Sequence, residues 1–190
     1  MSFCNIGELT YYGSVDSVPS NQIGFGFITG SQDNKYVYVF NSNSSCISVF
    51  ERNISNGSLT FIENSTLLGN ESKIYISQDS KNVYAVLGQT TFPIIIFNRD
   101  LITGELTQSG SYSPGTSDYY FQDIVISKDD KNIYLVSEGV NGGIYTLNRN
   151  LTNGQLSLND FISNNQLDGD LADDVKKITI SNDGKNVYTA

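Results

Sequence analysis

The chain has 190 residues, a formal net charge of −9 and no histidine. Its length indicates one domain, and its acidity argues against a surface that binds nucleic acid or an anionic membrane. The absence of histidine removes the commonest general base and the commonest metal ligand. No apolar run approaches the length of a membrane span, and the two cysteines, Cys4 and Cys46, have no metal-binding or redox spacing.

Residues 1–22 are expected to be the last part of a repeating unit whose beginning is missing. The sequence from Gly7 to Thr10 is identical to that from Gly104 to Thr107, so residues 9–15 are predicted to form an outermost strand. The first residues show neither the basic nor the apolar segment of a secretory signal, so a cytoplasmic location is the default expectation.

An eight-residue phrase, Ser-x-Asp-x-Lys-x-(Val/Ile)-Tyr, occurs four times, beginning at Ser31, Ser77, Ser127 and Ser181. The intervals are about 50 residues, a period typical of propellers and other repeat arrays. The aspartate of each phrase can bond to the backbone two residues further on, which favours a tight turn. Each copy therefore predicts a hairpin between two strands.

A second phrase follows each of the first three copies at a constant offset. It carries an arginine and then a glycine, namely Arg52 and Gly57, Arg99 and Gly104, and Arg149 and Gly154. The glycines supply the positive φ that a tight hairpin needs. Because an arginine recurs at the same position of each repeat, we interpret these arginines as structural rather than catalytic.

Together the phrases predict three complete antiparallel units of four strands and the beginning of a fourth. The expected units are 23–72, 73–120, 121–174 and 175–190. The predicted strands are 23–30, 36–41, 46–52 and 59–67, then 73–77, 82–87, 93–99 and 106–112, then 121–127, 132–137, 143–148 and 155–162, and finally 175–181 and 186–189.

Several of these strands are continuously apolar, for example Ile74–Ile76, Ile94–Phe97 and Ile124–Ile126. Such runs indicate burial on both faces, which is unusual for an isolated antiparallel meander. Stacking the sheets face to face buries both sides, so an all-β propeller is the predicted fold. A sandwich would show a cleaner alternation of polar and apolar residues and ranks second.

The repeated phrase, followed by Ile-x-Val-Phe and a Thr-Gly-x-Leu-Thr turn, resembles the lactonase-type seven-bladed β-propellers. That family includes bacterial 6-phosphogluconolactonase and is related to the YVTN-type propeller repeats. The resemblance covers nearly the whole chain, but its motifs build blades and specify the fold more strongly than an activity. No catalytic residue can be transferred from it.

Seven blades need more than about 300 residues. The chain is therefore expected to be a segment of a longer propeller, a half-propeller that self-association with a second copy completes, or a small four-bladed ring.

Propellers bind ligands at one end of the central channel, and the sequence places polar groups near the starts of inner strands there. We expect an unknown small molecule or protein to contact this rim at Tyr119, Tyr120, Gln122, Asp123 and Glu138. The acidic run Asp168, Asp170, Asp173 and Asp174 offers oxygen ligands for Ca²⁺. Its spacing does not fit the twelve-residue calcium loop, so a solvated loop without a cofactor is the main expectation.

Two functions remain open on the sequence. The first is a non-catalytic binding or interaction propeller, which the acidity, the missing histidine and the incomplete ring favour. The second is a hydrolase that acts on a sugar lactone such as 6-phosphogluconolactone and needs a complete ring. In that case a carboxylate, Asp123 or Glu138, would have to serve as the base.

Overall fold

The protein is described by a computed structural model that covers residues 26–41, 44–66, 72–87, 94–115, 120–139, 142–166 and 175–190. Its strands form three four-stranded sheets and one two-stranded sheet, each an antiparallel meander in sequence order. The first sheet contains β1 (Ile28–Gly30), β2 (Tyr36–Asn41), β3 (Cys46–Arg52) and β4 (Leu59–Thr66). The second contains β5 (Ser72–Ile76), β6 (Asn82–Leu87), β7 (Ile94–Arg99) and β8 (Leu106–Tyr112). The third contains β9 (Tyr120–Ile126), β10 (Asn132–Glu138), β11 (Gly143–Arg149) and β12 (Leu156–Ser163), and β13 (Ile178–Ile180) pairs with β14 (Val187–Thr189).

The fold class predicted from the repeats is confirmed, because the structure shows propeller blades in an incomplete ring. Most strand bounds match the prediction within one residue, while β1 and β13 are shorter than expected. A short 3-10 helix, η1 (Asn164–Gln166), was not predicted. The strand expected at 9–15 lies outside the described residues.

The repeated phrase builds the first hairpin of each sheet by the same local contacts. In the second sheet, Ser77 Oγ donates to Asp79 Oδ1 at 2.6 Å, and the same oxygen accepts from the Lys81 backbone N–H at 3.1 Å. The residue after the aspartate has a positive φ in every copy: 60° at Asn34, 58° at Ser80, 61° at Asp130 and 72° at Gly184. The phrase is thus a hairpin signal with an identifiable mechanism.

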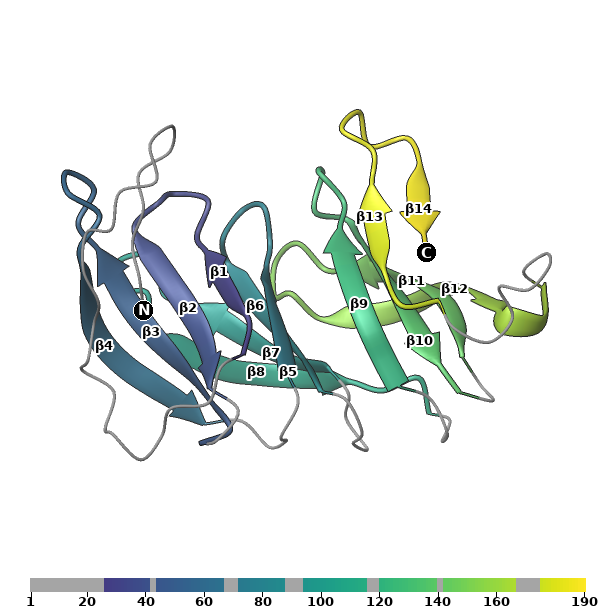
Figure 1. Ribbon diagram of the computed structural model, residues 1–190, viewed down its shortest axis with the longest axis horizontal. Coiled ribbons are helices and arrows are strands. Elements are labelled where there is room, and N and C mark those ends of the chain that lie inside the picture. The colour runs from purple at the N-terminus through teal and green to yellow at the C-terminus, as the bar shows by residue number, and fades with distance from the viewer. Residues whose placement is uncertain are drawn as a thin grey trace.

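The sheets stand one after another along the molecule (Figure 1). Apolar side chains fill the space between neighbouring sheets. Strand β6 shows how the two faces are divided. Val83, Ala85 and Leu87 belong to the core shared with the first sheet, whereas Tyr84 and Val86 belong to the core shared with the third. Both faces of the second sheet are therefore buried, which explains its continuous apolar strands.

An arginine also joins the second sheet to the first and the third sheet to the second. Between the first and second sheets, Arg99 Nε donates to Tyr38 Oη at 2.6 Å, and Arg99 Nη2 to Asp33 Oδ2 at 2.9 Å. The Tyr38 hydroxyl in turn donates to the Gly104 carbonyl at 3.0 Å. We call this set of contacts, with an arginine and a glycine from the later sheet and an aspartate and a tyrosine from the earlier one, the inter-sheet latch.

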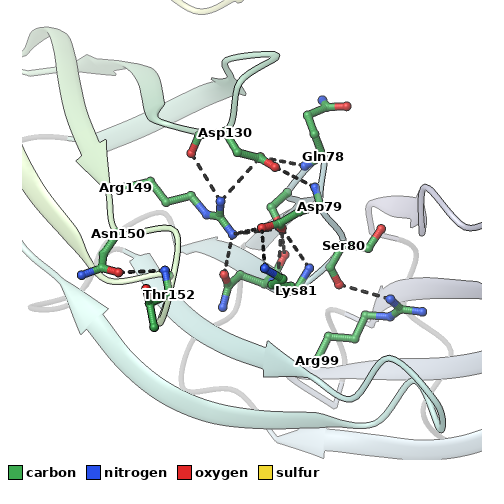
Figure 2. Close-up of polar contacts among 12 residues, drawn as sticks. Gln78, Asp79, Ser80, Lys81, Arg99, Asp130, Arg149, Asn150 and Thr152 are labelled. Atoms are coloured by element: carbon green, nitrogen blue, oxygen red, sulfur yellow. Dashed lines mark hydrogen bonds and ion pairs between the residues drawn. The ribbon is translucent and has the colours of Figure 1, made fainter.

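The same latch joins the second and third sheets, and Figure 2 shows its ion pair between Arg149 and Asp79. Arg149 Nε donates to Tyr84 Oη at 2.8 Å, Arg149 Nη2 contacts Asp79 Oδ1 at 3.0 Å, and Tyr84 donates to the Gly154 carbonyl at 3.0 Å. Burial alone would raise the pKa of Asp79, but hydrogen bonds from Ser77, from a backbone N–H and from Arg149 outweigh it and lower that pKa. The buried guanidinium therefore meets an ionised partner.

Candidate functional site

The first strand of each sheet lies beside the first strand of the next, so that β1, β5, β9 and β13 are neighbours in succession. In a propeller these inner strands surround the central channel. Polar side chains on or next to three of these strands meet there: Lys73 and Tyr75 from β5, Asp123 from β9, and Lys177, which precedes β13.

Asp123 is the centre of this group and connects three sheets. Its Oδ1 accepts a hydrogen bond from Tyr75 Oη at 2.5 Å. Its Oδ2 accepts from the Ile178 backbone N–H at 3.4 Å and lies 3.8 Å from Lys177 Nζ. The side chain is only 15% exposed, so these partners replace much of its hydration.

Glu138 lies nearby at the end of β10. It is in register with Tyr120 of β9, and its Oε1 is 3.6 Å from Lys176 Nζ. Tyr120 is exposed, and Gln122 is half-buried next to Asp123 and makes no side-chain hydrogen bond with the described residues. The structure thus places Tyr120, Gln122, Asp123 and Glu138 on two adjacent strands.

The amine of Lys73 is surrounded by charged groups of both signs and by an aromatic ring. Burial and then the like charge of Lys177 lower its pKa, and the charges of Asp123 and Glu138 oppose that shift only in part. Its Nζ also lies 5.4 Å from the centre of the Phe27 ring, within the range of a cation–π contact. An anion placed between Lys73 and Lys177 would reduce their repulsion.

Tyr75 is a fixed hydrogen-bond donor. Burial, followed by its hydrogen bond to Asp123 and the charge of that residue, raises the pKa of the Tyr75 hydroxyl strongly. We refer to Lys73, Tyr75, Asp123, Glu138, Lys176 and Lys177 as the channel cluster. It presents three amines, two carboxylates and a phenol, which suits a small ligand that carries both a negative charge and hydroxyl groups.

The sequence predicted the carboxylates of this cluster but missed its amines. Seven of the eleven basic residues occupy the recurring positions of the repeated phrases, which leaves four lysines at positions that do not recur. Three of those four, Lys73, Lys176 and Lys177, belong to the channel cluster. A lysine at a position that does not recur from one repeat to the next was therefore the signal that could have identified these amines.

The other residues proposed from the sequence, Tyr119 and the acidic run of Asp168, Asp170, Asp173 and Asp174, lie outside the described residues. Within the described ranges, no group of three or more acidic, cysteine or histidine side chains could hold a metal ion together. No helix among those residues is long and apolar enough to cross a membrane.

Comparison with known proteins connects this architecture to one family. The model of the family "Lactonase, 7-bladed beta-propeller" matches residues 4–121. The 6-phosphogluconolactonase of Bacillus subtilis is 32% identical over 77 residues, which make up 40% of this chain and 22% of that protein. The match therefore spans less than a quarter of the length of this curated relative.

Solved structures agree on the fold. A protein from Lactobacillus plantarum superposes with a TM-score of 0.78 at 18% identity, over 99% of this chain and 56% of its own. The periplasmic gluconolactonase of Pseudomonas aeruginosa superposes with a TM-score of 0.68 at 16% identity, over 87% of this chain and 46% of its own. This chain thus spans about half of each structure, and at such identities the likeness shows the fold alone. Since the family model covers more than half of the chain and the repeats form its blades, the chain belongs to the lactonase family of seven-bladed β-propellers.

Proposed function

We propose that this segment is a binding propeller whose channel cluster holds a small hydroxylated anion, such as a sugar acid, without hydrolysing a substrate by itself. The observation that carries the proposal is the half-buried Lys73 beside the exposed Lys177, since an anionic ligand would relieve the repulsion between their charges. The overall charge of −9 does not oppose this, because three amines gather locally in the channel cluster.

The environment of Asp123 supports binding rather than catalysis. Tyr75 occupies one carboxylate oxygen, and the Ile178 N–H and Lys177 occupy the other. A general base must have an oxygen available to the proton that it removes, and both oxygens of Asp123 already have partners.

Lactone hydrolysis by the complete protein is the second candidate. The curated relative is a 6-phosphogluconolactonase, and a structural neighbour is a gluconolactonase. In that function the lysines would hold the acidic part of the substrate, and Asp123 or Glu138 would activate water once the rest of the ring were present.

Calorimetric titration with 6-phosphogluconate tests the binding proposal. We expect saturable binding, with affinity reduced about tenfold or more in Lys73→Met and in Lys177→Met, because each substitution removes a charge-assisted contact. Lys128→Met is the matched control, since Lys128 is also a lysine at a position that does not recur, but it contacts Asn182 at another turn. Unchanged affinity in both cluster variants would contradict the proposal.

A hydrolysis assay separates the two functions. With 6-phosphogluconolactone, the segment should not exceed the spontaneous rate of ring opening. Hydrolysis that disappears in Asp123→Asn or in Glu138→Gln would instead establish the second candidate, and the assay should also be run on the longest natural form of the chain.

A further inference from the structure

Lys73 differs from the other lysines in its exposure and in its partners. All eight lysines of the chain lie in the described ranges, and seven of them are exposed, whereas Lys73 at the start of β5 is half-buried. Its amine makes no hydrogen bond and no ion pair with the described residues. Burial penalises a charged amine that has no partner. One amine of the chain is therefore in a different chemical environment from the other seven.

The carboxylates of the channel cluster do not act as counterions for this amine, because other groups hold them. Both oxygens of Asp123 have partners, which include the Tyr75 hydroxyl at 2.5 Å and the Lys177 amine at 3.8 Å. Glu138 Oε1 lies 3.6 Å from Lys176 Nζ. The half-buried amine thus lies among charged groups without being paired to any of them.

This environment favours the neutral form of Lys73. Burial, followed by the positive charge of Lys177, lowers the pKa of Lys73. The negative charges of Asp123 and Glu138 raise it by less, so the net shift is downward. The Phe27 ring, whose centre is 5.4 Å from Nζ, is itself 41% exposed and attracts the ammonium only weakly. A neutral lysine is a nucleophile, and burial or a neighbouring cation activates the lysines that form Schiff bases with carbonyl compounds.

We propose that Lys73 is a covalent binding site for small aldehydes and ketones that carry an acidic group. The neutral Nζ adds to the carbonyl carbon to give a carbinolamine. The two amine protons and the carbonyl oxygen then leave as water, so an imine forms without an oxidant or a reductant. Hydrolysis by water reverses the step.

The acidic group of such a compound has a partner in the exposed amine of Lys177, whose charge already acts on Lys73. This choice of acidic compounds rests on the proposed function of the channel cluster. The reactivity of Lys73 does not, because it follows from the burial of an unpaired amine beside a second cation.

Reductive labelling of the 190-residue chain with glyoxylate and cyanoborohydride tests the proposal, because the reductant converts an imine into a stable secondary amine. Peptide mass spectrometry then measures the labelling rate at each of the eight lysines. We expect Lys73 to be labelled faster than each exposed lysine at about pH 8. Accessibility alone predicts the opposite order, with the half-buried Lys73 the slowest.

Three variants connect the labelling to this site. Lys73→Met should lose the fastest label while the other lysines keep theirs. Lys177→Met should move the pH profile of labelling at Lys73 to higher pH, because it removes the like charge that helps to lower the pKa of Lys73. Lys128→Met is the matched control and should leave that profile unchanged, since Lys128 contacts Asn182 at another turn. Far-ultraviolet circular dichroism checks that all three variants are folded.

Calorimetric titration with 6-phosphogluconate distinguishes a failure of this proposal from a failure of the proposed function. Selective labelling of Lys73 in a chain that does not bind 6-phosphogluconate would support the covalent site and contradict the binding of sugar acids. Labelling of Lys73 no faster than that of the exposed lysines, or a pH profile that Lys177→Met does not move, would overturn the covalent site.

Discussion

Arg149 and Asp79 form an ion pair at 3.0 Å across the boundary between two sheets, although 70 residues separate them in the sequence. The guanidinium is fully buried, and the carboxylate is 26% exposed. The third sheet is thus tied to the second by a buried charge, as Arg99 and Asp33 tie the second sheet to the first.

Removing the charged partner should be costly where the latch is complete. We expect Arg149→Met to lower the free energy of unfolding by about 3–5 kcal/mol, because Asp79 and the Tyr84 hydroxyl lose their buried partner. Arg52→Met, at the same repeat position in the first sheet, should cost no more than about 1 kcal/mol, because among the described residues its guanidinium bonds only to the Asn34 carbonyl of its own sheet. Urea denaturation measures both, and equal costs would show that the latch does not stabilise the array.

The latch glycines provide a second matched pair. Gly104→Ala and Gly57→Ala impose the same backbone penalty, about 1–2 kcal/mol, since both residues have φ near 76°. Only Gly104→Ala also forces the Tyr36 ring to move. We therefore expect Gly104→Ala to lower the melting temperature clearly more than Gly57→Ala does, and the reverse order would contradict the packing described above.

High pH should weaken the latch through its tyrosines. Burial is the main cause that raises the pKa of Tyr38 and Tyr84 from 10.0 to about 12, despite the nearby arginines. Between pH 10 and pH 12 the unfolded chain releases these protons while the folded chain retains them, so the free energy of unfolding falls as pH rises. Urea midpoints across this interval measure the slope. Tyr84→Phe should have a shallower slope, and an unchanged slope would mean that Tyr84 does not contribute.

The hydrogen bond from Tyr75 to Asp123 should be measurable by a double-mutant cycle. Asp123→Ala leaves the half-buried Tyr75 hydroxyl without its acceptor and should cost about 1–3 kcal/mol. In a Tyr75→Phe background the same substitution should cost less, because no hydroxyl remains to be satisfied. Equal costs in the two backgrounds would show that the two side chains are energetically independent.

The sequence was sufficient to predict the blades. Each Ser-x-Asp phrase and each glycine turn acts over a few residues, and the strands between them are short, so local patterns placed β2, β3, β6 and β8 correctly. The same patterns carried no information on which sheet an arginine contacts. Arg99 and Arg149 were interpreted as structural from their period, but their partners in the preceding sheet, Asp33 and Asp79, became known only from the packed structure.

The repeat alone determined that this protein consists of small antiparallel sheets with two buried faces, because hairpin geometry and apolar periodicity are local properties. Only the tertiary structure decided that Lys73, Asp123 and Lys177 meet at the channel. They lie on different sheets about one repeat apart, and no local interaction relates them. Their proximity results from stacking the sheets around a common axis, which places the beginnings of successive inner strands side by side.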